Sequence, residues 1–316
     1  MTRQTPNLDT VKQAHERIRS FIHRTPVLTS QLLDVAAGAE LFFKAENLQK
    51  VGAFKARGAT NAVLGLSDKE AAAGVCTHSS GNHGAALAMA ARRRGVPAHI
   101  VMPDNAPAVK KAAVAAYGAR IIECESTLNA REQTLQRIVK ETGAHVVHPY
   151  DDARIIAGQG TVGLELLEQV SGLDVVVVPV GGGGLLAGVA TAVKEISPRT
   201  EVVAVEPEGA DDAFRSFGLG RRVLQTAPDT IADGLRSSLG ELNFEIILER
   251  VDTILTVPDS LIVEAMQLQW SRMKTVVEPS GAVSYAGVLA HPERFRGRRV
   301  GLVISGGNVD LTRLPW

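Results

Sequence analysis

The stretch that decides the fold is Asp174-Val-Val-Val-Val-Pro-Val-Gly181-Gly182-Gly183-Gly184-Leu-Leu-Ala-Gly188. Its apolar, β-branched first half predicts a buried parallel strand, and the residues after the glycines predict a helix. Glycines at such a junction let backbone N–H groups approach an anion, which the positive end of the helix also favours. The stretch lacks the lysine of a P-loop, and it lacks a GxGxxG opening followed by an acidic ribose ligand. It therefore predicts a site for a small phosphate ester.

The amino-acid composition of the 316-residue chain argues against several classes of protein. Lysine plus arginine equals aspartate plus glutamate, 34 against 34, which argues against a nucleic-acid partner or a basic membrane-binding surface. The segment 175–193 carries no charge, but four glycines and Pro179 interrupt it, so we expect no membrane span. Two distant cysteines and a polar N-terminus without a signal peptide favour a reduced, cytoplasmic protein.

Strand-like and helix-like segments alternate along the chain. Short apolar strands are expected at 41–46, 74–77, 98–102, 120–124, 145–147, 175–180, 202–206, 254–257 and 300–305. The helical patterns between them include 85–94, 107–117, 129–142 and 261–275. This alternation indicates βαβ units with parallel sheets, which is the α/β class. The length predicts two lobes, and because no low-complexity linker separates them they should be closely packed or interleaved.

Two further motifs have the residue types of a reactive site. Phe54-Lys55-Ala-Arg57-Gly58-Ala places a lysine at an expected helix start, where the helix's positive end helps to lower the pKa of its amine. Ser79-Ser80-Gly-Asn82-His83-Gly opens an alanine-rich helix, and its N–H groups and hydroxyls suit a carboxylate. Taken singly, each motif has an ordinary alternative, namely an exposed lysine and a capped turn.

Polar residues also follow two later strands. The acidic loop 206–212 suits Mg²⁺ or Ca²⁺, with an acidic helix cap as the alternative. Ser305-Gly-Gly-Asn308 ends the last strong strand, where ligands bind in α/β sheets, although a plain glycine turn would look the same. His145 and His148 have an HxxH spacing that nothing else supports as a metal site, so we interpret them as ordinary strand and turn residues.

Taken together, five motifs resemble those of fold-type II pyridoxal-phosphate enzymes: FKARGA, SSGNHG, PVGGGGLLAG, VEPSGA (277–282) and SGGNVDL (305–311). The order is the same, and the resemblance is closest to the serine racemase and threonine dehydratase group. It implies a two-domain, tryptophan synthase β-like α/β fold in which each domain is a mainly parallel sheet flanked by helices. The large cofactor-binding domain would comprise residues 1–65 and 150–316, and the small substrate-closing domain residues 66–149.

The resemblance assigns a cofactor site. Lys55 would bind pyridoxal 5'-phosphate through its amine and would remove the substrate α-proton. Gly181, Gly182, Gly183 and Gly184 would hold the phosphate, Phe54 would lie beside the ring, and Asn82 would hydrogen-bond its 3-hydroxyl. Ser305 would face the pyridine nitrogen. Because a serine hydroxyl cannot fully protonate that nitrogen, such a site favours prompt loss of a β-hydroxyl group.

The same resemblance places a small-molecule amino-acid substrate against the 79–83 loop, with contributions from Ser79, Ser80, Asn82 and His83. Ser80 would stand opposite Lys55 and exchange a proton with the α-carbon, as in serine racemases, whereas many threonine dehydratases carry alanine there. Arg131 matches an arginine facing the pocket that would pair with a second carboxylate, the alternative being a helix-surface arginine. Ser238 would also line the pocket.

Glu206, Ala210 through its carbonyl, and Asp212 match the group's divalent-cation site, so Mg²⁺ or Ca²⁺ is expected. The prediction is an ammonia-lyase (dehydratase) that converts L-threonine or L-serine to a 2-oxo acid and ammonia by α,β-elimination. The alternatives are a serine racemase with side dehydratase activity and, because of Arg131, a threo-3-hydroxyaspartate ammonia-lyase. A homodimer is implied by the resemblance alone. Tyr150 replaces the asparagine of mammalian serine racemases, which argues against nucleotide activation.

Overall fold

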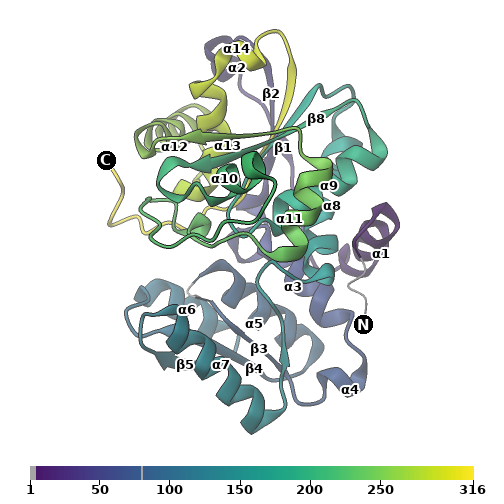
Figure 1. Ribbon diagram of the computed structural model, residues 1–316, viewed down its shortest axis with the longest axis vertical. Helices are drawn as coiled ribbons and strands as arrows, with labels where there is room; N and C mark the ends of the chain where they lie inside the picture. Colours follow the sequence, from purple (N-terminus) through teal and green to yellow (C-terminus); the bar gives the residue numbers. More distant parts are fainter. Residues whose placement is uncertain (1–4, 80) are drawn as a thin grey trace.

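The computed structural model describes residues 5–79 and 81–316, which form two lobes, each built on one β-sheet (Figure 1). The six-stranded sheet has the order β1-β2-β10-β7-β8-β9, and the four-stranded sheet has the order β5-β4-β3-β6. Every neighbouring pair is parallel except β1 and β2, which are antiparallel. The predicted α/β class with mainly parallel sheets is confirmed.

The strands are short and apolar. Those of the larger sheet are β1 (Val27–Leu28), β2 (Glu40–Ala45), β7 (Val175–Pro179), β8 (Glu201–Pro207), β9 (Thr253–Val257) and β10 (Arg299–Ile304). Those of the smaller sheet are β3 (Val75–His78), β4 (Ala98–Pro103), β5 (Arg120–Cys124) and β6 (His145–Val146).

The α-helices of the described residues are α1 (Leu8–Ile18), α2 (Gln31–Ala37), α3 (Lys55–Leu64), α4 (Asp68–Ala71), α5 (Asn82–Arg94), α6 (Ala108–Ala116), α7 (Leu128–Thr142), α8 (Ala153–Gln169), α9 (Gly184–Ile196), α10 (Asp212–Leu219), α11 (Glu241–Arg250), α12 (Asp259–Met273), α13 (Pro279–Ala290) and α14 (Pro292–Phe295). Short 3₁₀ turns lie at Glu46–Leu48, Lys50–Gly52, Glu208–Ala210 and Asp233–Leu235. Among these residues, no helix has both the length and the apolar character that crossing a membrane requires.

Strand β7 lies between two apolar cores, one on each face of the six-stranded sheet. Val175 and Val177 pack into the first core, and Val176 and Val178 pack into the second. Successive side chains of a strand point to opposite faces, so a strand covered on both sides must be apolar at every position. Burial on both faces of the sheet therefore explains why β7 has valine at successive positions. The buried strand also determines where the glycine stretch leaves the sheet.

Helix α8 packs closely against α3 and α9 through glycines. A Cβ atom on Gly158 would lie 2.6 Å from the Cα of Gly58, and one on Gly160 would lie 2.9 Å from the carbonyl oxygen of Gly188. These approaches exclude any larger residue. The three helices form a tight layer that carries Lys55 at its edge.

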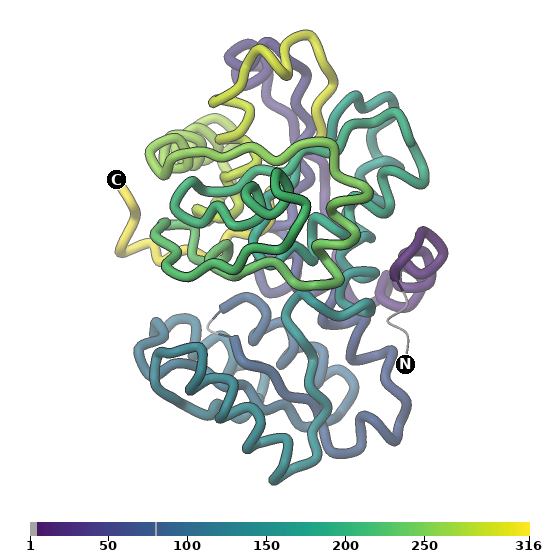
Figure 2. Tube along the Cα trace, viewed as in Figure 1, coloured from purple at the N-terminus to yellow at the C-terminus, as the bar shows by residue number. Residues whose placement is uncertain are grey.

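The chain passes from the first lobe to the second and back (Figure 2). It enters the four-stranded lobe after α3 and returns through residues 147–152 to α8. All strands of the four-stranded sheet lie between residues 75 and 146. The domain boundaries at 65/66 and 149/150 stay predictions.

Candidate active site

Lys55 begins helix α3 at the junction of the two lobes. Its Nζ donates a hydrogen bond to the carbonyl oxygen of Pro149 at 2.8 Å and lies 5.1 Å from the centroid of the Phe54 ring. Burial lowers the pKa of Lys55 to about 8. A larger share of this amine is unprotonated near neutral pH than of an exposed lysine, which suits it as a nucleophile or base.

The glycine stretch forms the turn from β7 into α9. A Cβ atom on Gly182 would lie 2.4 Å from the ring of Tyr150, and one on Gly181 would lie 2.8 Å from the Cα of Leu235. Gly183 adopts φ +91°, a conformation that other residues rarely accept. The first N–H groups of a helix have no partner within it, so this turn can hold an anion such as a phosphate.

Asn82 begins α5 in the four-stranded lobe, and two residues of the other lobe hold its amide. Its Nδ2 donates to Oε1 of Glu278 at 2.9 Å, and its Oδ1 accepts from Nδ2 of Asn308 at 2.9 Å. The Asn308 backbone N–H donates to Oε2 of Glu278 at 3.1 Å. Burial raises the pKa of Glu278 to about 8. Both contacts fix the orientation of Asn82, and no other described residue accepts from its second N–H, which suits that group to a ligand.

Ser305 follows β10 and lies against the segment that carries Lys55. Its carbonyl oxygen accepts a hydrogen bond from the Phe54 backbone N–H at 3.0 Å. Its buried hydroxyl donates to the carbonyl oxygen of Ser280 at 3.3 Å. The structure thus brings the end of β10, Phe54 and Lys55 together.

The loop after β3 is shaped by its own polar groups. The Ser79 hydroxyl oxygen accepts from the backbone N–H of Gly84 at 3.1 Å and of Gly81 at 3.3 Å. His83 is 3% exposed, and its Nε2 lies 3.3 Å from the carbonyl oxygen of Val147. Burial, and next the charge of Lys55, lower the pKa of His83 well below its usual value, so the ring is neutral and Nε2 is the donor. Ser80 lies outside the described residues.

Arg131 lies in the first turn of α7, where its Nε donates to the Thr127 carbonyl oxygen at 3.3 Å. Burial lowers the pKa of His78, the last residue of β3, and the charge of Arg131 lowers it further. Helix α7 packs against β3, so Arg131 belongs to the same layer as the strand from which the 79–83 loop departs. Ser238 uses its hydroxyl oxygen to accept from the backbone N–H of Gln225 at 2.8 Å.

His148 was missed by the sequence interpretation. Its ring lies edge-on to Tyr150 with the centroids 4.6 Å apart. Burial lowers the pKa of His148 to about 4, with smaller contributions in the same direction from His78 and Lys55. His145, its HxxH companion, instead contacts Nη2 of Arg154 at 3.0 Å. The spacing alone gave no reason to separate the two histidines, and only the fold brings one of them near Lys55.

The predicted cation ligands lie around the turn from β8 into α10. Burial raises the pKa of Glu206 to about 9, although its oxygens accept from the backbone N–H groups of Ala213 and Phe214 at 3.1 and 2.9 Å. Asp212 accepts from the Leu239 N–H at 2.9 Å through Oδ2, while its buried Oδ1 has no partner. Burial also raises the Asp212 pKa, to about 6.

This donor set fits a hard divalent cation. Two completely buried carboxylates lie close in the fold, and no lysine or arginine side chain among the described residues hydrogen-bonds to either of them. The third predicted ligand, Ala210, offers a carbonyl oxygen, which Mg²⁺ and Ca²⁺ accept. Residues 5–79 and 81–316 contain no cluster of three acidic, histidine or cysteine side chains suited to a metal. The proposed set has only two such side chains, because its third ligand is a backbone carbonyl.

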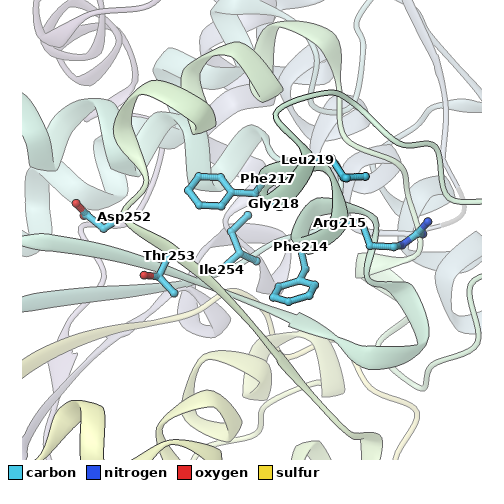
Figure 3. Close-up of a pocket in the computed structure, with 8 residues that line it drawn as sticks. All are labelled: Phe214, Arg215, Phe217, Gly218, Leu219, Asp252, Thr253 and Ile254. Carbon is cyan, nitrogen blue, oxygen red and sulfur yellow. The ribbon is translucent and has the colours of Figure 1, made fainter.

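An apolar hollow lies between α10 and β9, away from Lys55 in the fold. Figure 3 shows its lining, in which Phe214, Phe217, Leu219 and Ile254 are prominent. None of the predicted catalytic, cofactor or substrate residues lines it.

The chain matches the family model described as "Pyridoxal-phosphate dependent enzyme" over residues 18–306. It is 51% identical to a beta-hydroxyaspartate dehydratase of Paracoccus denitrificans, covering 98% of this chain and 99% of the relative. It is 50% identical to a serine racemase of Arabidopsis thaliana, covering 96% and 93%. It is also 48% identical to the L-threo-3-hydroxyaspartate ammonia-lyase of Saccharomyces cerevisiae, covering 98% and 95%.

The fold matches that of a solved relative. The structure of maize serine racemase superposes with a TM-score of 0.96 at 45% identity, covering 98% of this chain and 95% of the other. The comparisons thus include both lyases and racemases among proteins that match over nearly the whole chain.

Proposed function

Because the chain belongs to the family of pyridoxal-phosphate-dependent enzymes, we propose that it is an ammonia-lyase acting on a β-hydroxy amino acid with a second carboxylate, 3-hydroxyaspartate. The net reaction removes the α-proton, expels the β-hydroxyl as water and, after hydrolysis, gives a 2-oxo acid and ammonia. The observation that carries the choice of substrate is the place of Arg131 in the first turn of α7, which packs on β3, so that its charge acts on His78 at the end of that strand. A guanidinium pairs with a planar carboxylate through two hydrogen bonds.

The residues at the junction of the lobes fit the cofactor. The N–H groups of 181–184 would hold the phosphate, Lys55 would bind the cofactor covalently, Asn82 would donate to the 3-hydroxyl, and Ser305 would face the ring nitrogen. When bound, pyridoxal phosphate draws electrons from the substrate's α-carbon, so its α-proton becomes acidic. The side-chain-free surface of the glycine turn and the fixed amide of Asn82 support this assignment.

The chain's own groups would bind the substrate and move its proton. The N–H groups of the 79–83 loop would hold the α-carboxylate and so would bring the α-carbon near Lys55. The amine of Lys55, with its lowered pKa, would accept the α-proton. Ser80 would serve the opposite face of the α-carbon.

The finer parts of the prediction remain proposals. We propose Glu206, Ala210 and Asp212 as the ligands of Mg²⁺ or Ca²⁺, supported by the orphaned Oδ1 of Asp212. The segment 66–149 would close over the substrate as a small domain. Two unpaired cysteines support a reduced, cytoplasmic setting. A homodimer also remains a proposal, which the family resemblance implies.

The second candidate is a serine racemase, which the Arabidopsis relative favours, or a serine/threonine dehydratase. Chiral analysis of serine after incubation with the enzyme measures the first activity. Ser238 would line the pocket in either case.

The substrate choice is tested by removing the guanidinium. Arg131→Met should lower kcat/KM for L-threo-3-hydroxyaspartate by about tenfold or more and leave kcat/KM for L-threonine within about twofold, because a charge-assisted pair is lost only with the dicarboxylate. Arg137→Met is the matched control, since Arg137 lies on the same helix and pairs with Glu141 on its surface. An equal fall for both substrates with Arg131→Met would contradict the proposal.

A further inference from the structure

His148 lies in the connection that carries the chain from β6 back to α8, and the backbone of that connection fixes one of its ring nitrogens. Nδ1 faces the backbone N–H of Asp151 at 2.8 Å and that of Tyr150 at 3.4 Å. A backbone N–H can only donate, so Nδ1 must accept and cannot carry a proton. The ring is therefore held in one orientation and in one tautomer.

The other nitrogen is a free donor. Because Nδ1 carries no proton, the neutral imidazole of His148 bears its proton on Nε2. Nε2 makes no hydrogen bond to any described residue. It is also not one of the completely buried polar atoms that lack a partner. The ring itself is half-buried. An N–H group of fixed direction thus has no acceptor among residues 5–79 and 81–316.

The surroundings of His148 are those of the site. Lys55 donates to the carbonyl of Pro149, the next residue, and the charges of His78 and Lys55 both act on the His148 ring. Tyr150, on which the ring packs, covers Gly182 of the glycine turn. His148 therefore lies beside the residues assigned to the cofactor and within the electrostatic influence of the β3 end at His78.

Of the three substituents on the substrate's α-carbon, two already have partners in the proposed function. The amine goes to the cofactor and the α-carboxylate goes to the 79–83 loop. The side chain remains, and in 3-hydroxyaspartate it ends in a carboxylate that has several acceptor positions. Arg131 would supply a positive charge to this carboxylate. A neutral N–H donor would satisfy the remaining acceptor positions of the carboxylate without the cost of desolvating a further charge.

We propose that His148 is a substrate-selectivity residue, which donates its Nε2–H to the β-carboxylate of the substrate. The inference rests on the proposed function for the identity of the substrate. It adds a second contact that the sequence motifs do not contain.

Two substitutions of His148 distinguish the role of Nδ1 from that of Nε2. Asparagine places Oδ1 where histidine has Nδ1, so His148→Asn keeps the acceptor for the Asp151 N–H and loses the donor. Glutamine places an N–H where histidine has Nε2–H, so His148→Gln keeps the donor. We expect His148→Asn to lower kcat/KM for L-threo-3-hydroxyaspartate about 10- to 100-fold relative to L-serine, and His148→Gln to retain most of the selectivity. His99→Asn, at the opposite end of β4 from the site, is the matched control and should change neither ratio.

Inhibition provides a readout that does not depend on which substrate is turned over. Succinate carries the second carboxylate, and butyrate carries a methyl group in its place. His148→Asn should raise the inhibition constant of succinate about tenfold or more and leave that of butyrate unchanged. Equal losses for both acids, or for both substrates, would overturn the role of His148. A wild-type enzyme that prefers L-threonine while succinate still depends on His148 would instead overturn the proposed substrate and keep the His148 contact.

Discussion

Replacing Arg57 with methionine tests how the helix that carries Lys55 is anchored. The Arg57 guanidinium donates to both oxygens of Glu46 at 2.7 and 2.8 Å, and to both oxygens of Glu165 at 2.7 and 2.8 Å. Lys44 donates to Glu165 at 2.7 Å. All four side chains are at most 1% exposed. Two positive and two negative charges thus balance one another inside the large lobe, two residues after Lys55.

The expected loss of stability in Arg57→Met follows from the negative charge that the substitution leaves unbalanced. Arg57→Met would leave Lys44 to balance both Glu46 and Glu165, which is one net negative charge in a buried site. Breaking a buried ion pair in this way costs about 3–5 kcal/mol, against a total stability of about 5–15 kcal/mol for a typical protein. Adding Glu46→Gln restores neutrality, so the double variant should recover about 1 kcal/mol or more of the loss.

Urea unfolding followed by far-UV circular dichroism measures these differences in the free energy of unfolding. Arg57→Lys is the conservative variant: it keeps the charge but loses the double hydrogen bonds, so it should fall between the wild type and Arg57→Met. A loss below about 1 kcal/mol for Arg57→Met would refute the reasoning. So would a double variant that is less stable than the single one.

Two further predictions concern the cation ligands and the glycine turn. Because the folded pKa values of Glu206 (about 9) and Asp212 (about 6) are raised, the contribution of these two groups to the stability of the metal-free fold is fully present below their unfolded pKa values and is lost as the pH rises through the folded ones. The melting temperature in a chelator should therefore fall between pH 5 and pH 9 more steeply than with Ca²⁺, and parallel profiles would argue against the cation site. Gly182→Ala should weaken pyridoxal-phosphate binding about tenfold or more, because its Cβ would lie 2.4 Å from the Tyr150 ring. Gly218→Ala is the control, since nothing lies within 4 Å of its added Cβ, and equal affinity in both variants would contradict the role of the turn.

Strands and helix ends were predictable because local chemistry determines them. The predicted strand at 120–124 matches β5, and that at 175–180 exceeds β7 by one residue. Gly95 and Gly143, which directly follow the predicted helical patterns 85–94 and 129–142, end α5 and α7 in the left-handed conformation. Runs of β-branched residues and glycines after helical patterns leave little choice of local structure.

Helix α8 was not among the predicted elements, because its own sequence argues against a helix. Glycine disfavours a helix interior, and α8 contains Gly158, Gly160 and Gly163. The close approach of α3 and α9 reverses that preference, since only glycine fits between them. This contact depends on residues about 100 positions away along the chain, as in the Gly58–Gln159 hydrogen bond, for which the sequence separation is 101.

The candidate site shows the same contrast between features set by local sequence and contacts between distant residues. The contiguous motifs around Lys55, Asn82 and the glycine turn were visible in the sequence. The partners that orient them were not, because Glu278 and Asn308 reach Asn82 from 196 and 226 residues away. The position of His148 beside Lys55 likewise depends on the path of the connection between the lobes.

The central claim is that this pyridoxal-phosphate enzyme selects a substrate with a second carboxylate. Its most direct test is the release of 2-oxo acid by the wild-type enzyme from L-threo-3-hydroxyaspartate and from L-threonine, with pyridoxal phosphate and Mg²⁺ present in both assays. The account predicts that kcat/KM for hydroxyaspartate exceeds that for threonine by about tenfold or more. Equal values, or a preference for threonine, would contradict it.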